Sequence, residues 1–141
     1  MFYITTTRFN DDTFLQNRNY CIRNNGLFYG TPTQLKENIK PNANIVVIEM
    51  NNSKNKIMGI GLVKNEIRKQ KYHRIYEDQN YNRFTYIGKK RIDIEEIVDV
   101  YDKQVLAALE NLFFKGSTHL KRAQGITELP NWILHNTANF D

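Results

Sequence analysis

The sequence predicts an α+β fold, a bent β-barrel of about five or six strands flanked by helices and followed by a long C-terminal helix. Short runs of β-branched and aromatic residues, separated by Asn, Gly and Pro, fill most of the chain before Asp93. Two of these runs are joined by a short polar turn, as in a β-hairpin. Beyond Asp93 the apolar residues recur at steps of three and four, which is typical of an amphipathic helix.

Length and composition favour a single domain, residues 1–141, with a core at about 1–100 and a helical extension at 93–141. Hydrophobic residues make up 40% of the chain, which is enough for a packed core and argues against disorder. The formal net charge of +5 favours an anionic partner such as nucleic acid. No apolar stretch reaches the roughly 20 residues of a membrane span, so no membrane role is expected.

The single cysteine, Cys21, excludes an internal disulfide and a cysteine-cluster metal site. A free thiol is typical of reducing compartments, so we expect a cytoplasmic or nuclear protein. The three histidines lack metal-ligand spacing, and no set of nucleophile, base and oxyanion donors can be assembled. We therefore expect neither an enzyme nor a bound metal or cofactor.

The first elements follow from β-branched residues and helix caps. Residues 1–7, MFYITTT, predict a strand. Asn10 or Asp11 can cap a helix that runs to the NNG sequence, where Gly26 provides a left-handed stop.

The next segment, LFYGTPTQLKENIK, begins with a short apolar run. Pro32 then favours the first turn of a small helix that starts near Thr31. Pro41 closes this helix, because proline cannot continue one.

A β-hairpin is the clearest local pattern in the chain. The apolar run NIVVIEM, the polar turn NNSKN and the returning run KIMGIGLVKN predict two antiparallel strands joined by a loop of about five residues. The segment that follows, EIRKQKYHRIYEDQNYN, has no clean period and is interpreted as a long loop. RFTYIGKKRI, residues 83–92, predicts a further strand.

Residues 93 to about 115 predict the long C-terminal helix, since one face is apolar along the whole segment. Asp93 and Glu96 form the sequence pattern of a capping box, and Gly116 provides a stop. The tail is expected to dock on the body through Trp132, Ile133 and Leu134.

Two glycines, Gly59 and Gly61, occupy alternate positions within the second strand of the hairpin. A nucleotide-binding G-x-G-x-x-G needs a third glycine and a following helix, and this segment has neither. Alternate positions of a strand share one face, so the pair leaves a bare patch there. We expect a close approach to the backbone at this patch, either by a core aromatic residue or by a ligand.

The loop after the hairpin combines aromatic and basic side chains. Tyr76 and Tyr81 lie within it among several lysines and arginines. Aromatic faces stack on bases while neighbouring cations contact phosphates, so a base-binding role is one interpretation. In the tail, Lys121 and Arg122 form either a phosphate contact or a solvated basic turn.

The order of these pieces resembles the PUA-like domains, in particular the YTH and EVE families. The hairpin NIVVIEMNNSKNKIMGIGLVKN is similar to their hairpin, whose second strand carries G-x-(G/A)-x-V, here Gly59, Gly61 and Val63. FYITTT resembles their opening strand, and NYCIRNNG stands where they place the first pocket wall. YNRFTYIGKKRIDIEEI is similar to the strand that leads to their closing helix, so the resemblance spans about residues 1–100.

This resemblance also implies a site. YTH domains hold N6-methyladenine of RNA in an aromatic cage, and EVE domains are linked with modified bases in DNA or RNA. The positions that correspond to a base-binding pocket are Tyr20, Tyr76 and Tyr81, with Phe28 and Tyr29 as alternative wall residues. A basic rim for phosphates would come from Lys64, Arg68, Arg74, Arg83, Lys121 and Arg122.

The sequence thus favours a non-catalytic nucleic-acid-binding module, with a base of RNA or DNA, modified bases included, as its ligand. The alternative is a protein-interaction or oligomerisation module, in which the 93–115 helix docks on a partner or on a second copy in a homodimer. A third interpretation, a nucleic-acid-processing enzyme that uses His119, lacks an accompanying acid or base.

Overall fold

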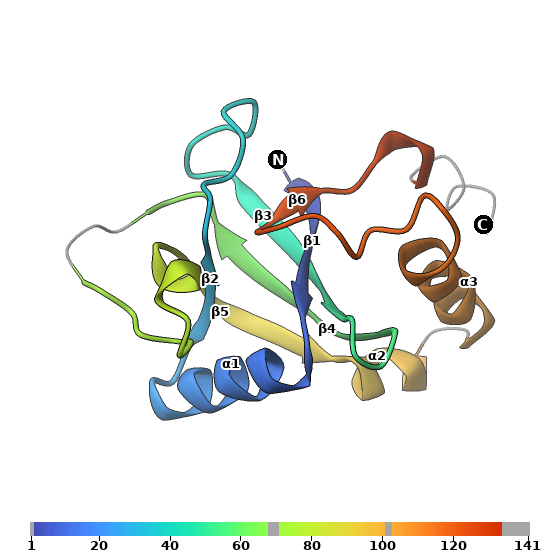
Figure 1. Ribbon diagram of the computed structural model, residues 1–141, viewed down its shortest axis with the longest axis horizontal. Helices are drawn as coiled ribbons and strands as arrows, with labels where there is room; N and C mark the ends of the chain where they lie inside the picture. The colour runs from blue at the N-terminus through green and yellow to red at the C-terminus, as the bar shows by residue number, and fades with distance from the viewer. Residues whose placement is uncertain (1, 68–70, 101–102, 134–141) are drawn as a thin grey trace.

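The structure, a computed structural model, describes residues 2–67, 71–100 and 103–133. Over these residues it is an α+β fold with a six-stranded sheet (Figure 1). The strands are β1 (Phe2–Phe9), β2 (Leu27–Thr31), β3 (Asn44–Asn51), β4 (Lys56–Lys64), β5 (Phe84–Asp93) and β6 (Thr127–Glu128). The helices are α1 (Asp11–Arg23), the short 3₁₀ helix η1 (Gln79–Asn82), α2 (Ile94–Val100) and α3 (Lys103–Phe114).

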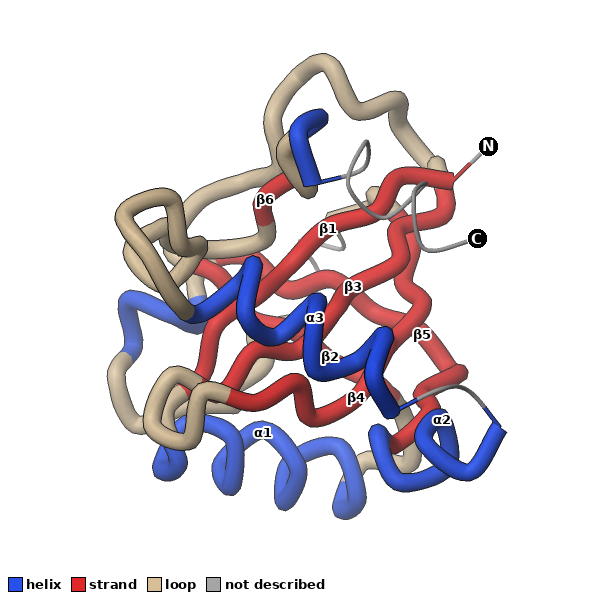
Figure 2. Tube along the Cα trace, turned by 90° about the vertical axis from the view of Figure 1, so that its right-hand side faces the viewer, coloured by secondary structure: helices blue, strands red, loops and turns tan. Residues whose placement is uncertain are grey.

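The sheet has the strand order β2-β5-β4-β3-β1-β6 and curls into a half-barrel (Figure 2). β1 and β3 are parallel, and the other neighbouring pairs are antiparallel. Register shifts in the β3–β4 and β4–β5 pairs mark bulges, which bend strands locally. The predicted α+β class with a strongly bent sheet is confirmed at this level. None of the helices in the described part is long and apolar enough to cross a membrane.

β1 and α1 form where the sequence predicts them. Asn10 caps the helix: its side chain accepts a hydrogen bond from the Thr13 N–H (2.8 Å), and its own N–H donates to the Thr13 hydroxyl (3.0 Å). At the far end the left-handed residue is Asn25, with φ of 51°, so the expectation that Gly26 provides the stop is wrong. Asparagine tolerates this conformation, and the chain therefore turns one residue earlier.

The small helix expected from Thr31 onwards is absent, and bends and turns follow β2 instead. Side chains from distant elements bind the backbone groups of this segment. The Leu35 N–H donates to the Tyr86 hydroxyl (2.9 Å), and the Asn65 amide donates to the Ile39 carbonyl (3.0 Å). Since Leu35 and Ile39 are also buried, tertiary contacts outweigh the local helix.

The single long helix expected over residues 93–115 is instead two helices, α2 and α3, with residues 101–102 outside the described part. α2 packs against β4 and β5 at the end of the sheet, whereas α3 runs across the hairpin (Figure 2). Asp93 caps α2 by accepting a hydrogen bond from the Glu95 N–H (3.1 Å). Gly116, with φ of 80°, follows α3 as predicted.

α3 covers the outer face of the β3–β4 hairpin and forms a second, smaller core there. Phe113 is fully buried in this core, and the tail contributes Ile133, also fully buried, as expected. Trp132 is 38% exposed, and Leu134 lies outside the described residues. The two-residue strand β6 precedes this part of the tail; so short a strand leaves no pattern in the sequence.

Gly59 and Gly61 make room for two side chains of the main core, on the inner face of the half-barrel. A Cβ on Gly61 would collide with the Tyr29 hydroxyl, and a Cβ on Gly59 would lie 2.6 Å from the Arg91 guanidinium. The expected close approach is therefore made from within the fold, by a core aromatic residue at one glycine and by an arginine at the other.

Those two side chains meet at a buried carboxylate, Glu49 of β3. Arg91 of β5 donates to both of its oxygens, at 2.6 Å from Nη2 and 2.9 Å from Nε, and the Tyr29 hydroxyl of β2 donates at 2.5 Å. Glu49 is 0% exposed, so these partners replace water entirely. The network joins three strands across the inner face.

Arg91→Met is expected to lower the free energy of unfolding by about 3–5 kcal/mol, because it leaves Glu49 buried without its cation. Urea denaturation measures this change. Lys90→Met is the matched control, since Lys90 is exposed on the same strand and its loss should change stability by no more than about 0.5 kcal/mol. Adding Glu49→Leu to Arg91→Met should restore most of the stability. A double variant no more stable than Arg91→Met would contradict this interpretation.

Candidate functional site

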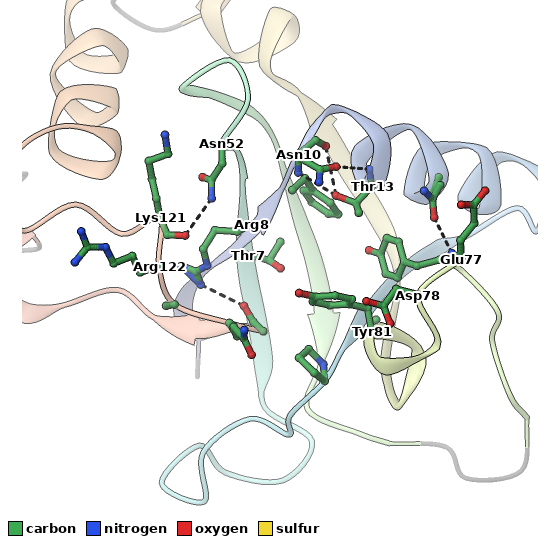
Figure 3. A pocket seen from close by; sticks show the side chains of 18 residues that line it. Thr7, Arg8, Asn10, Thr13, Asn52, Glu77, Asp78, Tyr81, Lys121 and Arg122 are labelled. Carbon is green, nitrogen blue, oxygen red and sulfur yellow. Dashed lines mark hydrogen bonds between the residues drawn. The ribbon is translucent and has the colours of Figure 1, made fainter.

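A cleft of about 520 Å³ lies where β1 leads into α1 (Figure 3). In the described part of the chain, β6 pairs with β1 at Thr5 and Thr6, and the end of β1 beyond this pairing, residues 7–9, borders the cleft. One wall is formed by the loop around residues 76–81, and the opposite wall by residues 121–125. Small-molecule sites in proteins measure roughly 300–1,000 Å³, so the cleft can hold a ligand of that size.

Tyr76 forms the fixed base of the first wall and is only 5% exposed. The side chain of Asn82 accepts a hydrogen bond from the Tyr76 N–H (2.9 Å) and donates one to its carbonyl (2.8 Å). Asn17 of α1 donates to the Tyr76 hydroxyl at 3.1 Å. Burial raises the pKa of the Tyr76 phenol, which therefore stays protonated at neutral pH.

Tyr81 is the partly exposed aromatic residue of this wall, and it points into the cleft (Figure 3). It packs edge-on against Tyr76, with ring centroids 6.4 Å apart and planes at 75°. Asp78 fixes the turn before it by accepting a hydrogen bond from the Asn80 N–H (3.0 Å). The Tyr81 carbonyl lies where a Cβ on Gly30 would be, so this glycine lets the loop approach β2 closely.

The opposite wall is basic. Arg8 of β1 holds the tail segment in place by donating to the carbonyls of Leu120 (3.0 Å) and Gly125 (3.2 Å). Between these two residues the chain carries Lys121 and the exposed Arg122, which both line the cleft. Figure 3 shows Arg8, Lys121 and Arg122 on the side of the cleft away from Tyr81 and its neighbouring carboxylates.

The remaining aromatic residues implied by the family resemblance lie outside the cleft. Tyr20 and Phe28 pack against the buried His73, with a hydrogen bond of 2.6 Å between the Tyr20 hydroxyl and His73 Nδ1. Tyr29 is buried in the core with its hydroxyl on Glu49. The structure therefore brings two of the expected pocket residues, Tyr76 and Tyr81, to one cleft and separates the others from it.

The basic residues expected at the rim are likewise divided between the cleft and other parts of the surface. Those that line the cleft are Lys121 and Arg122. Those elsewhere on the described surface are Lys64, Arg74 and Arg83. Arg83 lies over the ring of Phe84, 5.8 Å from its centroid, and Arg68 is outside the described residues.

Sequence reasoning missed several cleft residues, among them Arg8, Asn52 and Asp78. A signal existed for Arg8, because it is a lone charge directly after the predicted strand, residues 1–7. Asn52 and Asp78 lie in turns, where asparagine and aspartate are common for structural reasons and so attract no notice. Among the described residues there is no cluster of three or more His, Cys, Asp or Glu side chains that could hold a metal ion.

Comparison with known proteins adds no further assignment. No protein-family model, curated protein or solved structure matches this chain. Its function is therefore inferred from the cleft itself.

His73 supports the loop that leads to Tyr76, and burial, together with the nearby charge of Lys71, lowers its pKa below the usual 6.5. Since the folded state favours the neutral imidazole, His73 should contribute stability above about pH 6.5 that is lost as the pH falls through the folded-state pKa. Urea denaturation at several pH values should show this loss, and His73→Gln should make it smaller. An NMR titration of His73 with a midpoint at or above 6.5 would contradict the expectation.

Proposed function

We propose that the chain is a non-catalytic nucleic-acid-binding module of the PUA-like kind, which holds one unstacked base in the cleft beside β1. The observation that carries this proposal is the combination of a partly exposed tyrosine, Tyr81, with the basic residues Lys121 and Arg122 on the facing wall. Aromatic rings stack on bases, and cations contact the adjoining phosphates. The net charge of +5 favours the same class of partner.

The polar groups beside Tyr81 limit the bases that fit. A carboxylate such as that of Asp78 accepts hydrogen bonds and cannot donate them, so it pairs with an amino group on the base edge. Adenine, cytosine and guanine carry such a group, whereas uracil and thymine offer only their ring N3–H as a donor, so the carboxylate favours the first three bases. An amino group with a single methyl substituent keeps one N–H, so a base modified in this way also suits the site.

A single cleft of this size suits a base in a single-stranded or locally opened nucleic acid. Sequence-specific recognition of RNA uses such splayed bases, and enzymes that act on DNA bases flip them out of the duplex. We therefore propose single strands as the preferred ligand, of RNA or of DNA.

The alternative, a docking or oligomerisation role for residues 93–115, has less support from the packing. The apolar face of α3 is used inside the protein, where Phe113 and Phe114 are buried against Met50 and Ile57. Light scattering that shows a stable dimer, together with no oligonucleotide binding at low salt, would favour the alternative.

Tyr81→Ala is expected to weaken binding of single-stranded oligonucleotides by about 5- to 150-fold, because one base–aromatic stack is worth about 1–3 kcal/mol. Fluorescence anisotropy with RNA and DNA strands, with and without modified bases, measures the loss. Tyr72→Ala is the matched control, since Tyr72 is 60% exposed and does not line the cleft. For Tyr76 the substitution is Tyr76→Phe, which removes only the hydroxyl. Tyr76→Ala would remove a buried ring and lower the free energy of unfolding by about 3–5 kcal/mol. Equal affinities of the Tyr81→Ala variant and the parent would refute the stacking role.

Arg122→Gln is expected to weaken binding of all single-stranded sequences alike. If Arg122 neutralises one phosphate, the slope of log K against log salt should become less steep by about 0.7. Arg83→Gln removes the same charge at a site away from the cleft and should leave the slope unchanged. The same change in slope for both variants would mean that charge anywhere on the surface is sufficient, and that the cleft wall has no special role.

A further inference from the structure

Two buried side-chain polar atoms in the described part of the chain have no hydrogen-bond partner, and both belong to residues that line the cleft. They are Nε of Arg8 and Oδ1 of Asn52. Asn52 donates through its other terminal atom, Nδ2, to the Lys121 carbonyl (3.1 Å), which fixes Oδ1 as the unused acceptor. Buried polar groups are almost always paired, so two exceptions on one wall indicate that this wall is not purely structural.

Arg8 is also a partly buried charge, and the described residues offer it no counter-charge. Its Nη atoms donate to hydroxyl or carbonyl oxygens of Thr6, Leu120, Gly125 and Thr127, all of them neutral. No carboxylate of the described residues lies within ion-pair distance of it. By contrast, Arg91, which is also partly buried, binds Glu49 at 2.6 Å.

Burial lowers the pKa of Arg8 only to about 10, so its charge persists at neutral pH. A charge held in a medium of low polarity acts strongly on anything that enters the adjoining cleft. Its Nε–H is covered from solvent, so much of this effect acts through space rather than by direct contact. The partly exposed Lys121 and the exposed Arg122 extend the same positive region to the surface.

The two walls of the cleft therefore have opposite charge. Tyr81 lies with the carboxylates of Glu77 and Asp78, and the other wall carries Arg8 with its basic neighbours (Figure 3). A ligand that complements both walls has hydrogen-bond donors on a flat ring at one end and an anionic group at the other. A nucleotide has these features, with an amino group on its base and a phosphate on its sugar.

We propose that the cleft binds a nucleotide in a fixed direction, with the base on Tyr81 and Asp78 and the phosphate attracted by the guanidinium of Arg8. This inference rests on the proposed function and specifies which group of the ligand each wall receives. The phosphate belongs either to a free mononucleotide or to one unit of a strand, since both present the same chemistry.

The experiment compares adenosine, cytidine and guanosine with their 5′-monophosphates, with a short oligonucleotide and with inorganic phosphate, by calorimetry and NMR on the full chain. In the parent, each monophosphate should bind at least about 10-fold more tightly than its nucleoside, as expected for a charge-assisted interaction. A free mononucleotide is the ligand if the oligonucleotide binds no better than the monophosphate, and a strand is the ligand if it binds more tightly.

Arg8→Gln should reduce the ratio of nucleoside to monophosphate dissociation constants towards one while leaving nucleoside affinity within about twofold. Arg8→Lys, which keeps the charge, should retain most of the ratio. Arg23→Gln is the control, since Arg23 is exposed at the end of α1 and does not line the cleft. If Arg8 served only to hold residues 120–125 in place, Arg8→Lys, which cannot make the same set of hydrogen bonds, would lose the ratio as fully as Arg8→Gln, and that result would overturn the proposal.

The remaining outcomes separate this inference from the proposed function. Nucleosides that bind as tightly as their monophosphates would overturn the phosphate assignment and leave the base site intact. Inorganic phosphate that shifts the Arg8 Nε resonance, in a protein that binds no nucleoside or oligonucleotide, would support the anion site and contradict nucleic-acid binding. No response to any of these probes would overturn both.

Discussion

The buried carboxylate of Glu49 is the constraint on which the half-barrel depends. A charge that is fully removed from water must be matched inside the protein, and Tyr29 and Arg91 supply the match from two other strands. Their bulk in turn requires glycine at positions 59 and 61 of β4, because any side chain there would occupy the same space. The need to pair the Glu49 carboxylate thus determines which residues are possible at positions on four strands of the sheet.

The candidate site is coupled to this network through β2. The Tyr29 hydroxyl binds Glu49 and so fixes the position of β2. The next residue of the strand, Gly30, lies against the carbonyl of Tyr81. The position of the aromatic wall is therefore set by a strand whose own position is fixed by an ion pair in the core. In the loop itself, the side chain of Asn82 forms the hydrogen bonds that a neighbouring strand would provide in a sheet. It accepts from the N–H groups of Ile75 and Tyr76 and donates to the Tyr76 carbonyl.

Local sequence patterns predicted the secondary structure well where neighbouring residues determine it. They failed where contacts with distant residues determine the backbone conformation. The hairpin, the Asn10 cap and the stop at Gly116 depend on neighbouring residues and appear as expected. The segment after β2 has a helical pattern but takes its hydrogen bonds from Tyr86 and Asn65, which no local pattern reveals.

The same distinction applies to the site. Tyr76 and Tyr81 were found because aromatic residues in a basic loop are conspicuous in a sequence. The importance of Arg8 depends on what surrounds it in space, namely the presence of neutral acceptors and the absence of a carboxylate among the described residues near it. A buried charge without a partner cannot be recognised until the fold is known.

The bonds from Arg8 to Leu120 and Gly125 span 112 and 117 positions of the chain, so the basic wall of the cleft is assembled from opposite ends of the described sequence. During synthesis β1 emerges well before the segment that carries Lys121 and Arg122, so this segment cannot cover Arg8 until strands β1 to β5 have left the ribosome. The cleft is therefore completed after these five strands. A fragment that ends before residue 120 would lack the basic wall however well the five strands folded.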